Sequence, residues 1–262
     1  MSWLPSRRSA VYATHGCIAT SQPAASEIGL RILRAGGNAA DACVAAAAAL
    51  NVAEPTMTGI GGDVFCLFWD AKTRRVHGLN GSGRSPLGLD AARARATGGP
   101  AGRPAATAGL DPSSVHCVTV PGAAAAWADT VAQFGTLPLS EVLAPAIDLA
   151  EAGVPVHEIA AHCWAEQEHQ LTRWGERTPG AAALLVDGRA PKAGEVMVMR
   201  ELASTFRALG REGKAGFYRG RVAQAIVDVV RRCGGALSLA DLEAHATEVR
   251  QMPVAHEAAS IA

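Results

Sequence analysis

The chain has 262 residues, enough for one large domain or two small ones, and a globule of this size buries roughly three quarters of the surface of its unfolded chain. Hydrophobic residues make up 49% of the sequence and aromatic residues only 5%, so the core must be built from closely spaced Ala, Val, Leu and Ile. Twenty-four basic residues balance twenty-four acidic ones, which excludes a global attraction to nucleic acid or to an anionic membrane. The expected partner is a small molecule or another protein.

The cysteines and the N-terminus indicate the compartment. Six cysteines form no C-x-x-C pair, and several lie in apolar runs, which argues against a disulfide framework or a zinc ribbon. The start, MSWLPSRRSAVYATHG, lacks the apolar stretch of a secretory signal, and the longest apolar run, residues 42–50, is shorter than the ~18 residues of a membrane span. The sequence therefore predicts a reducing, cytoplasmic location.

The first predicted element is an amphipathic helix in the segment SQPAASEIGLRILRAGGN. Pro23 suits the first helical turn, and Gly36 and Gly37 end the helix. Helical spacing separates an apolar face from a charged face, with Ile28, Ile32 and Ala35 on one and Glu27, Arg31 and Arg34 on the other. This helix is expected to pack one side against the core and to leave the other in water.

A second helix is predicted to start at Asn38, whose side chain can cap it while Asp41 occupies the third helical position. It runs through ADACVAAAAALNV and ends before Pro55. The segment is apolar on all sides, which is typical of a helix enclosed by its neighbours. We expect it at the centre of the fold.

The segment TMTGIGGDVFCLFWD predicts a glycine turn that leads into a strand over residues 64–69. Residues 70–74 are expected to form a hairpin turn and residues 76–79 the returning strand. Arg84 is therefore expected just beyond a strand end.

The middle of the chain is expected to be an exposed loop followed by a strand and helices. Residues 96–114 are rich in Gly, Pro, Ala and Thr, which favours a surface loop rather than a domain boundary. The segment VHCVTVPG predicts a buried strand that leads into a helix over residues 122–134. Residues 139–153 predict a further helical stretch, interrupted at Pro145.

The last third of the chain is predicted to be helical. Residues 219–233 place four side chains at helical spacing before Gly234 ends the helix, namely Val222, Ile226, Val229 and Cys233. Ser238 and Asp241 then form a capping pattern. The final stretch, RQMPVAHEAASIA, has no comparable pattern. In the absence of a repeat or a linker, the sequence predicts a single domain over residues 1–262.

Three common site patterns were considered and not adopted. GIGGD lacks the Gly-Lys-Ser/Thr ending of a Walker loop, and its glycines open a strand rather than a helix, so nucleotide binding is not predicted. NGSGR around Ser82 does not match the G-x-S-x-G pattern of serine hydrolases. His162, Glu166 and His169 have the spacing of metal ligands on one helix face, but neighbouring polar residues favour a solvated face. The sequence predicts no metal and no cofactor.

Arg84 is the strongest candidate binding residue. It lies in GLNGSGRSP, a glycine-rich loop stiffened by Pro86, where a planar guanidinium can meet a carboxylate through two parallel hydrogen bonds. From these residues alone, an ordinary surface arginine in a turn remains the alternative.

A family resemblance favours the interpretation of Arg84 as a carboxylate-binding residue. From about Val11 to Val249 the chain resembles the large-subunit part of the gamma-glutamyltransferases (glutathione hydrolases). The resemblance rests on several blocks in the same order: ATSQPAASEIGLRILRAGGNAADACVAAAAALNVAEPTMTGIGGD, NGSGRSP, VTVPGAAAAW, LAPAIDLAEAGVPV and GFYRGRVAQAIV.

The resemblance implies an α+β protein with the αββα fold of N-terminal-nucleophile hydrolases, incomplete here because only the large-subunit portion is present. In this family a precursor cleaves itself to free an N-terminal threonine, which attacks the gamma-glutamyl amide with its own amine as base. Water or an amino acid then takes the acyl group from the acyl-enzyme. An arginine of the large subunit binds the alpha-carboxylate of the gamma-glutamyl group, and Arg84 matches that position.

The family's nucleophile belongs to a Thr-Thr-His motif that this sequence does not contain, so no catalytic residue is assigned. Thr14, which precedes His15, was considered as a substitute and rejected because it lies ahead of the first helix. The chain is expected to lack activity alone, to leave sheet edges uncovered and to represent a truncated product. A cephalosporin-acylase-like amidase and a non-catalytic partner of full-length protomers are the alternatives.

Overall fold

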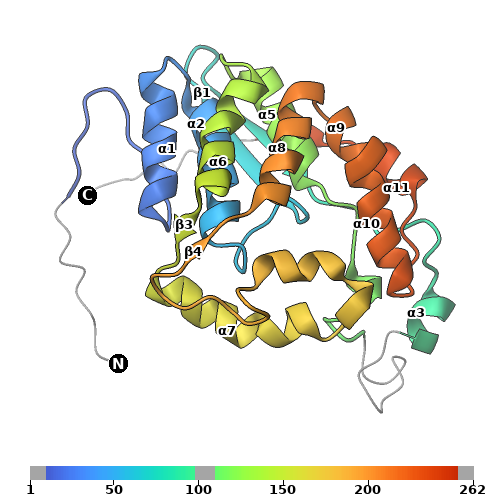
Figure 1. Cartoon of the computed structure of the whole chain (residues 1–262). Helices are drawn as coiled ribbons and strands as arrows, with labels where there is room; N and C mark the ends of the chain where they lie inside the picture. Colours follow the sequence, from blue (N-terminus) through green and yellow to red (C-terminus); the bar gives the residue numbers. More distant parts are fainter. Residues whose placement is uncertain (1–9, 98–109, 253–262) are drawn as a thin grey trace, which may run out of the picture.

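The computed structural model describes residues 10–97 and 110–252, which form an α+β structure (Figure 1). Its α-helices are α1 (Pro23–Arg34), α2 (Ala39–Ala53), α3 (Ala91–Thr97), α5 (Ala123–Phe134), α6 (Leu139–Ala152), α7 (Glu158–Thr172), α8 (Arg200–Glu212), α9 (Ala215–Tyr218), α10 (Gly220–Arg232) and α11 (Leu239–Glu243). Three 3-10 helices are η1 (Val115–Cys117), η2 (Gly175–Arg177) and η3 (Pro179–Leu184).

The strands form two antiparallel sheets. The larger has the order β1-β2-β5 and the smaller pairs β3 with β4. Their bounds are β1 (Val64–Asp70), β2 (Arg75–Gly81), β3 (Val154–Pro155), β4 (Val196–Met197) and β5 (Glu248–Met252). The predicted hairpin is confirmed, with Cys66 opposite Leu79 in its register.

The core is centred on α2, as its all-apolar sequence predicts. Helices α1, α2, α6 and α8 stand side by side, and each contacts the next (Figure 1). Asn38 caps α2 by accepting hydrogen bonds from the backbone of Ala40 and Asp41, and the Asp41 side chain accepts one from the Asn38 amide, which completes the capping box. Small alanine side chains allow the neighbouring helices to approach closely, so this layer is well buried.

The segment VHCVTVPG is not a strand, contrary to the sequence prediction. Its first residues form η1, and residues 118–122 form no regular element. Val120 is buried, as an apolar segment should be. Its amide donates one hydrogen bond to the Arg84 carbonyl at 3.0 Å and is not part of a series of strand-to-strand hydrogen bonds. The amides of Gly122 and Ala123 bond to the Gly62 carbonyl. The predicted burial holds for Val120 but not for Val118, which is 39% exposed, and the predicted strand hydrogen bonds are not formed.

Three other predictions are corrected. Helix α6 continues through Pro145, because packing against α2 and α8 compensates for the one backbone hydrogen bond that proline removes. The buried face of α10 is rotated from the predicted one and consists of Val222, Ala223, Val227 and Val230. The first three residues of the final stretch, 250–252, belong to β5, which pairs with β2, and the rest of that stretch lies outside the described residues.

The two faces of the larger sheet differ sharply. On the inner face, Phe68 stacks on Phe134 of α5 with ring centroids 4.6 Å apart. On the outer face, Phe65, Leu67 and Trp69 are exposed by 70%, 74% and 51%. Within the described residues, β1 pairs with β2 along one edge and with nothing along the other. The sheet therefore presents an uncovered apolar face, called here the outer sheet face, beside an open strand edge.

Candidate functional site

The Arg84 loop leaves the end of β2 and lies directly against residues 120–122. A Cβ atom on Gly83 would overlap the Val120 carbonyl, and one on Gly122 would overlap the Gly81 carbonyl. Only glycine permits this close backbone approach, so the sequence GSG before Arg84 has a steric explanation. The hydrogen bond from the Val120 amide to the Arg84 carbonyl fixes the loop further.

Two carboxylates hold the ends of this loop. Asp63 accepts a hydrogen bond from the Gly83 amide at 2.9 Å, and Asp241 accepts one from the Leu87 amide at 2.9 Å. Asp241 also caps α11 through Ser238, whose hydroxyl donates to it at 2.6 Å. Burial acts to raise the pKa of Asp241, but the hydrogen bonds from Ser238 and Leu87 outweigh it and hold the pKa below its ordinary value. Asp241 therefore stabilises the loop as a carboxylate.

The Arg84 side chain projects from this fixed loop into solvent. It is 89% exposed, and its Nη2 lies 4.0 Å from Oε1 of Glu248 on β5. Glu248 is also paired with Arg250 at 3.1 Å. No closer ion pair or hydrogen bond engages the Arg84 guanidinium within residues 10–97 and 110–252. Both of its parallel donors are thus available to an external carboxylate.

The wall beside Arg84 contains two residues that the sequence interpretation missed. The His245 ring stacks on the Tyr218 ring with centroids 5.3 Å apart. The Tyr218 hydroxyl donates to the Pro121 carbonyl at 2.6 Å and accepts from the Ala125 amide at 3.0 Å, and burial raises its pKa. Burial lowers the pKa of His245, with further contributions from Lys214 and Arg84. Because these contacts join distant segments, no local pattern could have indicated them.

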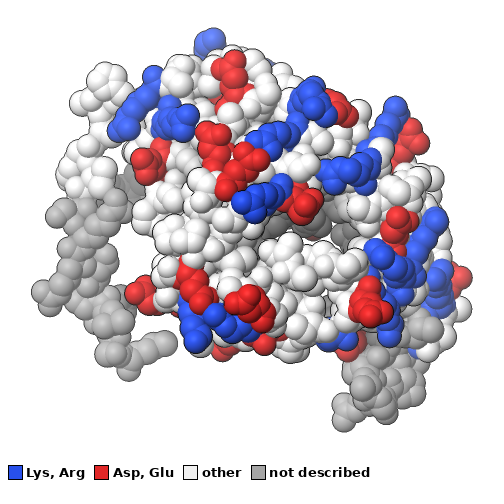
Figure 2. All heavy atoms as spheres, viewed as in Figure 1, with Lys and Arg blue, Asp and Glu red and all other residues white. Residues whose placement is uncertain are grey.

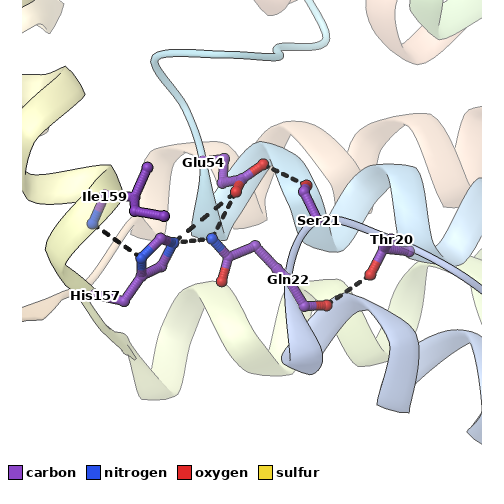
Figure 3. Close-up of polar contacts among 6 residues, drawn as sticks. All are labelled: Thr20, Ser21, Gln22, Glu54, His157 and Ile159. Atoms are coloured by element: carbon purple, nitrogen blue, oxygen red, sulfur yellow. Dashed lines mark hydrogen bonds and ion pairs between the residues drawn. The ribbon is translucent and has the colours of Figure 1, made fainter. Parts of the chain in front are cut away.

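A second polar cluster lies where α1, α2 and α7 meet (Figure 3). Ser21 and Gln22 both donate to the Glu54 carboxylate at 2.6 Å, and Gln22 also contacts Nε2 of His157. The Ile159 amide donates to Nδ1 of His157, which caps α7. The serine hydroxyl is bonded to the carboxylate and not to the imidazole, so the cluster lacks the Ser–His pair of an activated nucleophile. It joins three helix ends.

The match to a family model decides the family. The model described as Gamma-glutamyltranspeptidase matches residues 25–260, which is most of the chain. The chain belongs to this family. The gamma-glutamyltranspeptidase match includes the Arg84 loop, both of its carboxylate anchors and all of the helical layer around α2 except the first two residues of α1.

Relatives within the gamma-glutamyltranspeptidase family include proteins with different names. The chain is 34% identical to "Glutathione hydrolase proenzyme" of Bacillus subtilis, over 87% of this chain and 38% of the relative. It is 42% identical to the cephalosporin acylase structure from Bacillus halodurans, with a TM-score of 0.84 over 95% of this chain and 45% of the other. It is 26% identical to the Helicobacter pylori gamma-glutamyltranspeptidase structure, with a TM-score of 0.78 over 92% of this chain and 67% of that one.

These similarities confirm the predicted fold class. The structural neighbours are N-terminal-nucleophile gamma-glutamyltranspeptidases and acylases, and the present chain shares their mixed helix and sheet architecture. It spans less than half the length of the B. subtilis relative and of the acylase structure.

The other predicted candidates lie apart from the Arg84 loop. Thr14 is exposed, and its hydroxyl lies 2.8 Å from Nδ1 of His15. His162 and Glu166 are exposed on α7, with 3.5 Å between His162 Nε2 and Glu166 Oε1. No group of three or more His, Cys, Asp or Glu side chains among the described residues is placed to hold a metal. None of the helices in the described residues has the length and hydropathy needed to cross a bilayer.

Proposed function

We propose that this chain forms the carboxylate-binding part of an enzyme that transfers or hydrolyses gamma-glutamyl groups, with glutathione as the leading candidate substrate. One observation supports this most directly. Arg84 presents a guanidinium whose one ion pair within the described residues is as long as 4.0 Å. Its loop is held in place by close backbone contacts at glycines and by two carboxylates. Such a donor pair is rigidly positioned and suits the alpha-carboxylate of a glutamyl group.

In the proposed reaction, Arg84 binds and orients the substrate and takes no part in proton transfer. The alpha-carboxylate of the gamma-glutamyl group replaces Glu248 as the partner of the guanidinium. Hydrogen bonds of ordinary length to the substrate are stronger than the Arg84–Glu248 ion pair, whose atoms are 4.0 Å apart. The gamma-carbonyl is thereby held for attack by the N-terminal threonine that family members carry on a small subunit. The acyl-enzyme then passes its acyl group to water or to an amine.

The outer sheet face is the surface we propose for that small subunit. Phe65, Leu67 and Trp69 form an apolar row along β1, and the free edge of β1 offers backbone donors and acceptors to a further strand. A partner polypeptide with an apolar sheet face would cover both. The proposal explains why the chain is expected to be inactive alone.

An acylase is the second candidate, because this chain is 42% identical to the cephalosporin acylase structure over the aligned part, which covers 45% of the acylase chain. The two candidates differ in whether the substrate needs an alpha-amino group next to the carboxylate that Arg84 binds. A gamma-glutamyl enzyme is expected to contact the substrate's alpha-amino group, and a glutaryl group has the same carbon chain and carboxylate without that amine. Comparing gamma-glutamyl-4-nitroanilide with glutaryl-4-nitroanilide therefore separates them.

The test is release of 4-nitroaniline by the purified chain, alone and mixed with the small subunit of a related enzyme. We expect activity in the mixture only. Arg84→Ala should lower kcat/KM by about 100-fold, mainly through KM, and Arg84→Lys should restore part of the loss because lysine lacks the planar pair of donors. Arg34→Ala, on the exposed face of α1, is the matched control and should not change the rate.

Three outcomes would contradict the proposal. Activity of the chain alone would mean that a nucleophile lies within it. Equal rates for wild type and Arg84→Ala at low substrate would remove Arg84 from the binding site. A stable mixture without activity on either anilide would favour a non-catalytic partner.

A further inference from the structure

The Tyr218 hydroxyl joins the helices to the backbone that supports the Arg84 loop. Over the outer surface of α6 and α8, basic and acidic side chains lie side by side (Figure 2), and Arg207 of α8 pairs with Glu151 of α6 at 2.5 Å. Tyr218 differs from these surface groups, because it is only 5% exposed and lies on α9, which packs against α8, α10 and α11. A buried hydroxyl needs its hydrogen-bond partners inside the protein. Both partners of Tyr218 lie where α5 begins.

Helix α5 begins without a cap of its own. Its N-cap residue, Gly122, has no side chain, and a Cβ atom at that position would overlap the Gly81 carbonyl. The Ala125 amide, in the first turn, therefore needs an acceptor from elsewhere in the chain. The Tyr218 hydroxyl, 93 positions away in the sequence, accepts its hydrogen bond at 3.0 Å. The glycine that permits contact with β2 removes the local cap, and Tyr218 supplies one.

The same hydroxyl also holds the segment just before α5. It donates to the Pro121 carbonyl at 2.6 Å. Pro121 lies between Val120, whose amide donates to the Arg84 carbonyl, and Gly122, which contacts the end of β2. A phenol can donate one hydrogen bond and accept another, and Tyr218 uses both capacities. Residues 120–122 are thus held by Tyr218 on one side and contact the Arg84 loop on the other.

Two further observations show that this hydroxyl is fixed and protonated. The rings of His245 and Phe217 lie against the Tyr218 ring, with centroids 5.3 Å and 5.0 Å away. Burial raises the pKa of Tyr218, so the phenol keeps the proton that it donates to Pro121 at neutral pH.

We propose that Tyr218 is a positioning residue for substrate binding: its hydroxyl fixes the backbone against which the Arg84 loop rests and thereby sets the place of the guanidinium. This inference rests on the proposed function of Arg84. The hydroxyl bonds to the backbone of Pro121 and Ala125 and not to Arg84, so it acts through residues 120–122. A displacement of about 1 Å in a group that positions the substrate is enough to weaken catalysis.

The first test is hydrogen exchange on the chain alone. Tyr218→Phe keeps the ring and removes the hydroxyl, and it should make the amides of residues 82–87 and 120–125 exchange at least about fivefold faster. Trp164→Phe is the matched control, because it removes another buried aromatic donor, whose Nε1 bonds to the Leu184 carbonyl at 2.8 Å. This control should leave exchange in both segments unchanged.

A graded variant keeps the test decisive if Tyr218→Phe is too unstable to fold. Tyr218→4-aminophenylalanine retains a donor for Pro121 and offers Ala125 only a weak acceptor. Exchange of residues 82–87 should therefore rise by an intermediate factor, about twofold. Exchange equal to that of wild type in both variants, or in this one when the other does not fold, would overturn the positioning role.

The second test measures kinetics in the mixture with a related small subunit. Tyr218→Phe should raise KM for gamma-glutamyl-4-nitroanilide about three- to tenfold and change kcat less than about twofold, whereas Trp164→Phe should change neither. In an Arg84→Ala background, Tyr218→Phe should not raise KM further, because its effect passes through Arg84. An equal rise with and without Arg84 would overturn the inference and leave the proposed function intact. Wild-type activity of Arg84→Ala would overturn the proposed function and this inference with it.

Discussion

The chain buries its helical layer, formed by α1, α2, α6 and α8, more fully than its larger sheet, formed by β1, β2 and β5. The helical layer buries its apolar residues against its own neighbours and caps α2 with its own side chains. The sheet buries one face against α5 and leaves three large apolar side chains of the other face in solvent. The comparison indicates that stability resides in the helices, whereas the sheet is arranged for contact with another polypeptide.

The largest expected effect comes from breaking the helical layer. Phe206 of α8 is fully buried and contacts the Trp127 ring at 6.0 Å between centroids. Phe206→Ala should lower the free energy of unfolding by about 3–5 kcal/mol, because it removes a large side chain and leaves a cavity. Urea denaturation measures this difference. Leu67→Ala, on the outer sheet face, should change the stability of the chain alone by less than about 0.5 kcal/mol.

A charge placed on the outer sheet face should weaken association with a small subunit and leave the stability of the chain alone nearly unchanged. Leu67→Lys should leave the stability of the chain nearly unchanged but weaken its association with a related small subunit at least about tenfold, since a charge would be buried in the interface. Ile159→Lys places the same change at an exposed apolar residue of α7 and serves as the control. Similar association of both variants, measured by calorimetry, would show that the outer sheet face is not the docking surface.

The cap of α2 should contribute a smaller amount to the helical layer. Asn38→Ala removes the acceptor for the Ala40 and Asp41 amides and should cost about 1 kcal/mol in urea denaturation. Asn38→Asp keeps an oxygen acceptor at the same place and should retain most of the stability. Equal losses in both variants would mean that Asn38 acts through other contacts.

The smallest expected effect concerns Asp241, whose carboxylate holds the Arg84 loop through the Leu87 amide. The folded pKa of Asp241 is held below its unfolded value, so its contribution is fully present above about pH 4 and is lost as the pH falls through the folded pKa. Wild type should therefore lose more stability between pH 6 and pH 3 than Asp241→Asn, which cannot titrate. Identical pH dependence of the two urea midpoints would exclude a role for this ionisation.

What could be predicted from sequence was local. The α1 pattern, the Asn38 and Ser238 caps, the hairpin of β1 and β2 and the place of Arg84 after a strand all depend on neighbours within a few residues. The strand β5 was missed because its pairing with β2 joins residues far apart in the sequence. Apolar content predicts a strand at residues 118–122 because it reports burial and not hydrogen-bond partners. The stacking of His245 on Tyr218 joins residues that are separate in the sequence, so no local pattern indicates it.

The contact between Gly81 and Gly122 has a consequence for how this protein can change over evolutionary time. At this point the end of β2 meets the start of α5 through the backbones of Gly81 and Gly122, and the nearest side-chain atom to Gly81 is the Cβ of Ala126. Substitutions elsewhere in the helical core can shift side chains without altering this junction. Mutations can therefore accumulate in the core, and stability can drift, while the direction in which Arg84 points is inherited unchanged.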